Sequence, residues 1–273
     1  MEEVYEIHAL RYGSNQNRTR QENFLETVDD HDPVMPLDYF VWLIRNENRA
    51  VVVDMGFDHI EAKKRGRTIS ALPSQRLAQL GIDSKRVEDV INTHLHYDHA
   101  GGLKDFPNAK FHLQETEMAY ATGPCMCHET IKMPFTGAHV CEMVKNLYSG
   151  RVIFYNGIGS IKSGITVHLI GGHSRGLQSV RVKTENGYLC LASDATHFYE
   201  NFLMGKPFPI VVDLEDMLNG FKLIKNLATS NDMVIPGHDP LVKNFLVTGG
   251  SLYPVSYTHL RAHETSLHLV CRL

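Results

Sequence analysis

Residues 93–102 read Thr-His-Leu-His-Tyr-Asp-His-Ala-Gly-Gly, directly after a short apolar run that is typical of a strand. Side chains two apart on an extended segment point to the same side, so His94 and His96 can converge on one ion. The chain then turns, and Asp98 with His99 can face a second position. Imidazole and carboxylate groups are suitable ligands for zinc and neighbouring transition metals. The stretch therefore predicts a metal-binding loop at a strand end.

Three more residues of ligand type lie at the ends of predicted strands. They are His173 after the strand at 165–170, Asp194 after the strand at 188–192, and His238 after the strand at 233–235. Loops at strand ends carry functional side chains on a rigid scaffold. Each alone would be an ordinary loop residue, and the motif alone could be a run of surface histidines. All of them follow predicted strands, as the His94 motif does, and this makes one joint metal site the better interpretation.

The surrounding pattern predicts a layered α/β (α+β) protein. Strands are expected at 39–45 and 50–53, as a hairpin, and at 87–92, 111–113, 152–155, 165–170, 178–183, 188–192 and 233–235. Helices are expected at 73–80, 114–121, 138–148 and 213–228. This order favours two sheets covered by helices over a doubly wound parallel sheet.

Composition limits the classes of function. The chain has 273 residues, 43% of them hydrophobic and 21% charged, with a net charge of −4. It lacks the basic surface that nucleic acid requires, and it contains no apolar run long enough to span a membrane. The acidic start shows no secretory signal, and five cysteines are a poor disulfide framework, so we expect a cytoplasmic protein. Cys125, Cys127, His128, His139 and Cys141 could form a further zinc site, although free thiols are the better interpretation.

Residues 256–273 follow none of the strand and helix patterns found in the rest of the chain. They resemble translated adapter sequence, and we interpret them as a non-native tail. The expected hydrolase domain is then residues 1–255.

The motif His94-x-His96-x-Asp98-His99, with the three strand-end residues, resembles the metallo-β-lactamase superfamily, and within it the N-acyl-homoserine lactonases. The resemblance covers about residues 1–250 in motif order and implies an αββα sandwich with a dinuclear metal centre. It implies that the first ion is bound by His94, His96 and His173, the second by Asp98, His99 and His238, and both by Asp194. Asp54 matches the family's strand-end Asp, which implies that it orients a ligand, although an ordinary turn Asp is the alternative.

The resemblance also implies a reaction. A hydroxide that bridges two divalent ions would attack a lactone carbonyl, and Asp98 or Asp194 would carry the proton. We favour Zn²⁺, and iron, manganese or cobalt also suit such ligands. The lactonase-like features are the segment 28–39, the segment 198–209 and Pro236-Gly237-His238-Asp239. They favour N-acyl-homoserine lactones or related small lactones as the substrate.

One position departs from the lactonase pattern. Many of these enzymes have a Tyr three residues after the bridging Asp, and here that residue is His197. An imidazole can donate the same hydrogen bond to the substrate, and Tyr199 could also take this role. Both are therefore candidate catalytic residues.

Other readings remain open at this point. A thioester hydrolase of the glyoxalase II type shares the metal motif, but that family needs a C-terminal helical region, and only residues 239–255 lie between His238 and the tail, so it fits poorly unless the end is truncated. An exported β-lactamase, a nucleic-acid-processing enzyme and a non-catalytic binding module fit less well. We expect a small-molecule lactone as partner and neither nucleic acid nor membrane, and a homodimer is compatible with the sequence.

Overall fold

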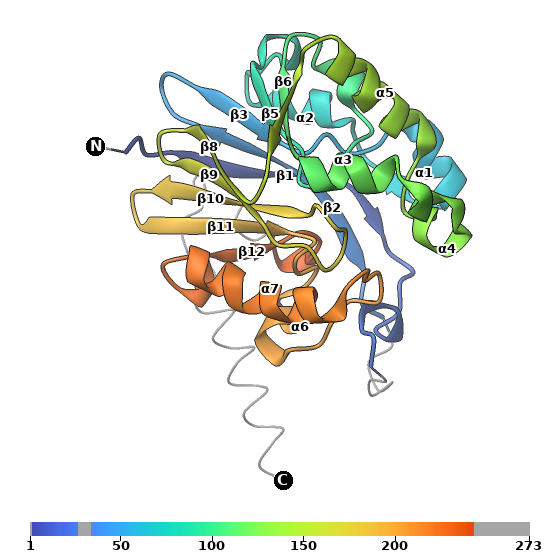
Figure 1. Ribbon diagram of the computed structural model, residues 1–273. Helices are drawn as coiled ribbons and strands as arrows, with labels where there is room; N and C mark the ends of the chain where they lie inside the picture. Colours follow the sequence, from blue (N-terminus) through green and yellow to red (C-terminus); the bar gives the residue numbers. More distant parts are fainter. Residues whose placement is uncertain (1, 27–33, 243–273) are drawn as a thin grey trace.

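The computed structural model describes residues 2–26 and 34–242, and two β-sheets pack face to face at its centre (Figure 1). One sheet has seven strands in the order β4-β1-β2-β3-β5-β6-β7, and the other has five in the order β12-β11-β10-β9-β8. The tail predicted at 256–273, the domain boundary at 255 and part of the segment 28–39 lie outside the described residues.

The strands of the first sheet are β1 (Glu6–Asn15), β2 (Leu37–Arg45), β3 (Ala50–Val53), β4 (Thr68–Ile69), β5 (Asp89–Ile91), β6 (Lys110–Gln114) and β7 (Val152–Tyr155). Those of the second are β8 (Ile158–Lys162), β9 (Ile165–Leu169), β10 (Gln178–Thr184), β11 (Gly187–Ser193) and β12 (Val234–Pro236). Both sheets mix parallel and antiparallel pairs.

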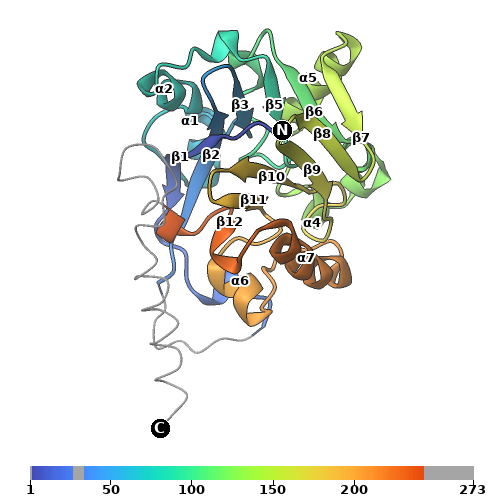
Figure 2. The ribbon, with the colours of Figure 1, turned by 90° about the vertical axis from the view of Figure 1, so that its left-hand side faces the viewer.

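Helices cover the outer face of each sheet, which makes four layers (Figures 1 and 2). On the first sheet lie α1 (His59–Arg65), α2 (Pro73–Gln79), α3 (Glu115–Ala121), α4 (Glu129–Lys132) and α5 (Gly137–Tyr148). On the second lie α6 (Tyr199–Met204) and α7 (Leu214–Leu227). The prediction of two helix-covered sheets is confirmed. No helix in the described ranges is both long and apolar enough to cross a membrane.

Strand β2 shows how the sequence produces these layers. Phe40, Trp42 and Ile44 belong to the core between the two sheets, whereas Val41 and Leu43 belong to the core beneath the helices. Alternate side chains of a strand point to opposite faces, so a strand that is apolar at every position must be covered on both sides. Burial of both faces places β2 in the interior of the sandwich.

Most predicted elements are confirmed, within a residue or two at their ends. The hairpin pairs Arg45 with Ala50, as expected for strands joined by a short polar turn. The sequence analysis omitted β1, β4, β8, α1, α4 and α6. Of these, β8 contains Gly159 and is exposed at Ile158, so it lacks the apolar alternation that marks the other strands.

Parallel pairing brings the chemistry to one edge. Strands β3 and β5 are parallel, and so are β11 and β12, so within each sheet the two following loops lie at one end. The Ser193 hydroxyl donates to the Thr93 hydroxyl at 2.9 Å, which joins the two ends. Asp54, the His94 loop, Asp194 and His238 follow these strands in turn. His173 joins them from the loop after β9.

Candidate metal centre

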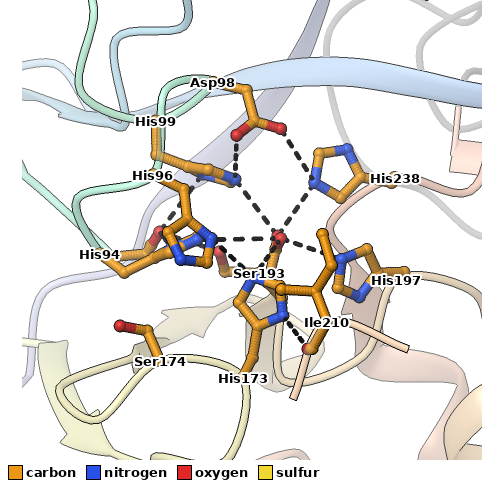
Figure 3. A network of polar contacts seen from close by, with 12 residues as sticks. His94, His96, Asp98, His99, His173, Ser174, Ser193, His197, Ile210 and His238 are labelled. Atoms are coloured by element: carbon orange, nitrogen blue, oxygen red, sulfur yellow. Dashed lines mark hydrogen bonds and ion pairs between the residues drawn. The ribbon is translucent and has the colours of Figure 1, made fainter. Parts of the chain in front are cut away.

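The seven predicted ligands are all buried and lie together at this edge. Their exposed fractions range from 0% at His94 to 9% at Asp98. Figure 3 shows rings turned toward a common centre, namely those of His94, His96, His99, His173, His197 and His238. Ligand atoms close enough to share an ion occur in the sets His94–His96–His173, His94–His99–Asp194, Asp98–His99–His238 and His173–Asp194–His197.

Asp194 divides the cluster into two halves. Its Oδ2 lies 3.1 Å from Nε2 of His173 and 3.8 Å from Nε2 of His94. Its Oδ1 lies 3.0 Å from Nε2 of His238 and 3.3 Å from Nε2 of His99. A single carboxylate therefore faces two separate groups of imidazoles, which is the geometry that a bridging ligand requires.

Four of the histidines have their outward ring nitrogen held in place. Nδ1 of His99 contacts Asp54 Oδ2 at 2.7 Å, and Nδ1 of His94 contacts the Thr93 hydroxyl at 3.1 Å. The backbone carbonyls of Ile210 and Asp38 accept from Nδ1 of His173 and His238, at 2.8 and 2.9 Å. Such contacts favour the tautomer that leaves Nε2 unprotonated, so these nitrogens can face an ion.

The donor set fits metal ions better than it fits hydrogen bonding within the chain. Nε2 of His94, Nε2 of His99 and Oδ1 of Asp194 are buried without a hydrogen-bond partner. Buried polar atoms normally have one, and unpaired groups aimed at a shared point are suited to bind a cation. Burial lowers the pKa of His94, and the neighbouring His99 and His96 lower it further. Neutral imidazoles of this kind are the form that binds metal.

The backbone around Asp194 is unusual in two places. Asp54 and Ser193 have φ of 61° and 50°, the only non-glycine residues with positive φ in the described part of the chain. Such conformations cost free energy and collect at functional sites. Gly237 is required by close approach, because a Cβ there would lie 2.8 Å from Asp194 Oδ1 and 2.9 Å from the Ser193 carbonyl.

Glu117 is a site residue that the sequence analysis missed. Its carboxylate accepts from the Leu95 amide at 2.9 Å, the Ser174 hydroxyl at 2.6 Å and the Gly176 amide at 2.9 Å. It therefore ties the His94 loop to the His173 loop. A Glu at the start of a predicted helix gave no local signal for this role, since its partners are 22 to 59 residues away.

The two candidate catalytic residues after Asp194 lie in different surroundings. Nε2 of His197 is 3.1 Å from Asp194 Oδ2, and its ring stacks on Phe208 at 3.5 Å. Burial lowers the pKa of His197 to about 3. Tyr199 instead packs in the core beside Phe202, with ring centroids 6.3 Å apart. Only His197 faces the cluster.

The cysteine-rich segment is separate from this centre. Cys125 is partly buried, whereas Cys127 and Cys141 are exposed. Within the described ranges, none of the groups able to hold a metal contains them. This agrees with the interpretation of free thiols.

A four-layer sandwich with a buried His and Asp cluster where its strands end defines a metal-site protein of the αββα class. Residues 34–238 match the family profile described as the metallo-beta-lactamase superfamily, and the chain belongs to that family.

Known relatives agree with this membership. The chain is 28% identical over 165 residues to the N-acyl homoserine lactonase AiiA of Bacillus thuringiensis subsp. kurstaki, covering 60% of each protein. It is 28% identical over 177 residues to the lactonase AttM of Rhizobium radiobacter, covering 60% of this chain and 63% of that protein. A probable metallo-hydrolase of Mycobacterium tuberculosis is 25% identical over 199 residues, or 65% of this chain and 63% of that protein. The chain thus matches about 60% of the length of these relatives.

Solved structures share the fold. A quorum-quenching N-acyl homoserine lactone lactonase superposes with a TM-score of 0.73 at 21% identity, covering 88% of this chain and 95% of that one. The dizinc quorum-quenching lactonase AidC, solved with N-hexanoyl-L-homoserine, superposes with a TM-score of 0.70 at 16% identity, covering 88% and 89%.

Proposed function

We propose that this chain is a dinuclear metal hydrolase that opens the ring of small lactones, such as N-acyl-homoserine lactones. The observation that carries the proposal is the Asp194 carboxylate, whose two oxygens face two different sets of imidazoles. The lactonases among its relatives support the choice of substrate class.

The proposed ligand assignment follows the two halves of the cluster. His94, His96 and His173 would hold the first ion, Asp98, His99 and His238 the second, and Asp194 both. When bound, two divalent ions lower the pKa of water and polarise an ester carbonyl; Zn²⁺ suits these donors, as do iron, manganese and cobalt.

The chain's own residues would orient the substrate and move the proton. His197 is buried and neutral, so its Nε2–H can donate a hydrogen bond to the ester carbonyl or the leaving oxygen. Asp98 is the most exposed of the seven proposed ligands, at 9%, and it can pass a proton to solvent. The buried position of the cluster keeps bulk water away from the reacting atoms.

The experiment is a pH-stat assay of metal-loaded protein against four kinds of substrate. These are N-acyl-homoserine lactones, a simple γ-lactone, S-lactoylglutathione and nitrocefin. We expect acid release from the lactones. Preference for S-lactoylglutathione would replace the lactonase proposal with the thioester-hydrolase alternative.

A variant links the reaction to the cluster. Asp194→Ala should abolish turnover and reduce the bound metal below two ions per chain, because it removes the carboxylate whose two oxygens face the two halves of the cluster. Glu185→Gln, in the exposed turn between β10 and β11, is the matched control and should change neither quantity. Full activity of Asp194→Ala would contradict the proposal.

A further inference from the structure

A line of polar groups leads outward from the Asp98 and His238 half of the cluster. The Tyr39 ring meets the His238 ring edge to face, with centroids 5.4 Å apart. The Tyr39 hydroxyl is 2.8 Å from the hydroxyl of Tyr97, which lies within the metal loop between His96 and Asp98. Nε of Arg67 in turn donates to the Tyr97 hydroxyl at 3.4 Å. The positive charge of Arg67 thus contacts the metal loop through the Tyr97 hydroxyl.

A second arginine lies near His197, through the ring of Phe208. The Arg18 guanidinium lies 5.0 Å over the ring of Phe208, the ring on which His197 stacks. Arg18 donates to the side-chain carbonyl of Asn23 and to the backbone carbonyl of Glu22, both neutral acceptors. Arg18 and Arg67 are only partly buried, so a solute can reach them.

Neither guanidinium forms an ion pair in the described part of the chain. Burial lowers the pKa of Arg67, but Tyr39, Tyr97 and Asp98 raise it overall, so this guanidinium stays charged. The nearby carboxylate of Glu22 is engaged by the amide and hydroxyl of Thr19, at 2.7 and 2.8 Å. Burial lowers the pKa of Arg18, and although Glu22 counteracts this, the charge of Arg67 lowers it further.

The two tyrosines add hydroxyl groups beside the guanidinium groups, and they do not add a negative charge. Phenol hydroxyls are neutral at pH 7, and both can donate or share hydrogen bonds. Two guanidinium groups and two hydroxyls next to a reaction centre form an environment that favours an anion.

We propose that Arg67, assisted by the Tyr97 hydroxyl and Arg18, binds a carboxylate on the substrate, so the preferred substrates are small lactones that carry a carboxylate. A planar guanidinium matches a carboxylate in a two-point contact, which a neutral acyl chain cannot make. The choice of lactones rests on the proposed function, whereas the carboxylate subsite rests on Arg67, Arg18 and the Tyr97 hydroxyl.

A binding experiment tests the subsite without requiring turnover. Cyclopentanecarboxylate and cyclopentanecarboxamide are titrated into metal-loaded protein by calorimetry. We expect the carboxylate to bind about 10- to 100-fold more tightly, as for one charge-assisted contact, and Arg67→Gln to remove the difference. Arg86→Gln, at an exposed position outside the site, is the control and should keep it. Equal binding of the two probes, or a difference that persists in Arg67→Gln because the carboxylate binds elsewhere, would overturn the proposal.

A kinetic arm separates this inference from the proposed function. 5-Oxotetrahydrofuran-2-carboxylate and its carboxamide contain the same lactone ring and differ in charge. We expect Arg67→Gln to raise KM for the carboxylate about 10- to 100-fold with little change in kcat, and to affect the carboxamide less than about three-fold. An equal loss with both substrates would overturn the subsite. If neither these lactones nor the N-acyl-homoserine lactones and the γ-lactone of the first panel are opened while the binding difference stands, the lactonase proposal fails and the carboxylate site does not.

Discussion

Replacement of Asp54 tests whether the metal centre depends on a residue that touches no ion in the proposed assignment. The Asp54 carboxylate is 2% exposed and accepts three hydrogen bonds. They come from the Thr93 amide and hydroxyl, each at 2.8 Å, and from His99 Nδ1 at 2.7 Å. Asp54→Ala would leave these donors buried and unpaired, which should lower the free energy of unfolding by about 3–5 kcal/mol.

Asp54→Asn separates stability from metal binding. Asn tolerates the φ of 61° as well as Asp does, and its carbonyl can still accept from Thr93. The side-chain NH2 of the new Asn would, however, donate to His99 Nδ1, so Nδ1 would have to act as the acceptor. The ring proton of His99 would then lie on Nε2, which faces Asp194. We expect a loss of about 1–3 kcal/mol in stability and of about 10- to 100-fold in metal affinity.

The assay has two parts. Chelator competition measures metal affinity, and denaturant unfolding in EDTA measures the stability of the metal-free protein. Asp58→Asn, four residues later at the exposed start of α1, keeps its capping role and serves as control. Unchanged metal affinity in Asp54→Asn would refute the reasoning and leave Asp54 as an ordinary turn residue.

Three further changes give distinct outcomes. Gly237→Ala places a methyl group 2.8 Å from Asp194 Oδ1. We expect kinetics to show a loss of about 100-fold in kcat/KM and metal analysis to show a lower metal content. Normal values would show that the loop shifts to accommodate the methyl group. Glu117→Ala leaves three buried donors unpaired. Denaturant unfolding should show a free energy of unfolding lower by about 3–5 kcal/mol, and Glu117→Gln should show a smaller loss. Equal losses of stability in the two variants would contradict the hydrogen-bond argument. Burial raises the pKa of Asp89, but His112 and Lys162 lower it more, so the folded-state pKa lies below the ordinary value. The Asp89 carboxylate should therefore stabilise the fold above about pH 4, and this stabilisation should be lost as the pH falls through the lowered pKa. Asp89→Asn should therefore lower stability at pH 7 and flatten the acid limb of a stability profile taken in EDTA, and an unchanged profile would rule this out.

Part of the site was predictable from the sequence because its geometry is local. His94, His96, Asp98 and His99 lie within six residues, so the spacing of a strand and a turn is enough to group them. The remaining candidates were found by a weaker rule, that polar residues at strand ends meet at one edge of a sandwich. The hairpin after β2 was predictable for the same reason, since Asn46-Glu47-Asn48 interrupts two apolar runs.

The rest depended on contacts between distant segments. The sequence identified Asp194 as a candidate bridge only through a resemblance; its two oxygens acquire different neighbours because β11 pairs with β12 and the His173 loop folds over from β9. Glu117 and Arg67 had no local pattern at all, because their partners come from other loops. Spacing along the chain determined which side chains could bind metal. The packing of the two sheets determined which oxygens, hydroxyls and charges surround those side chains. These neighbours come from long-range contacts, which the periodicity of the sequence does not encode.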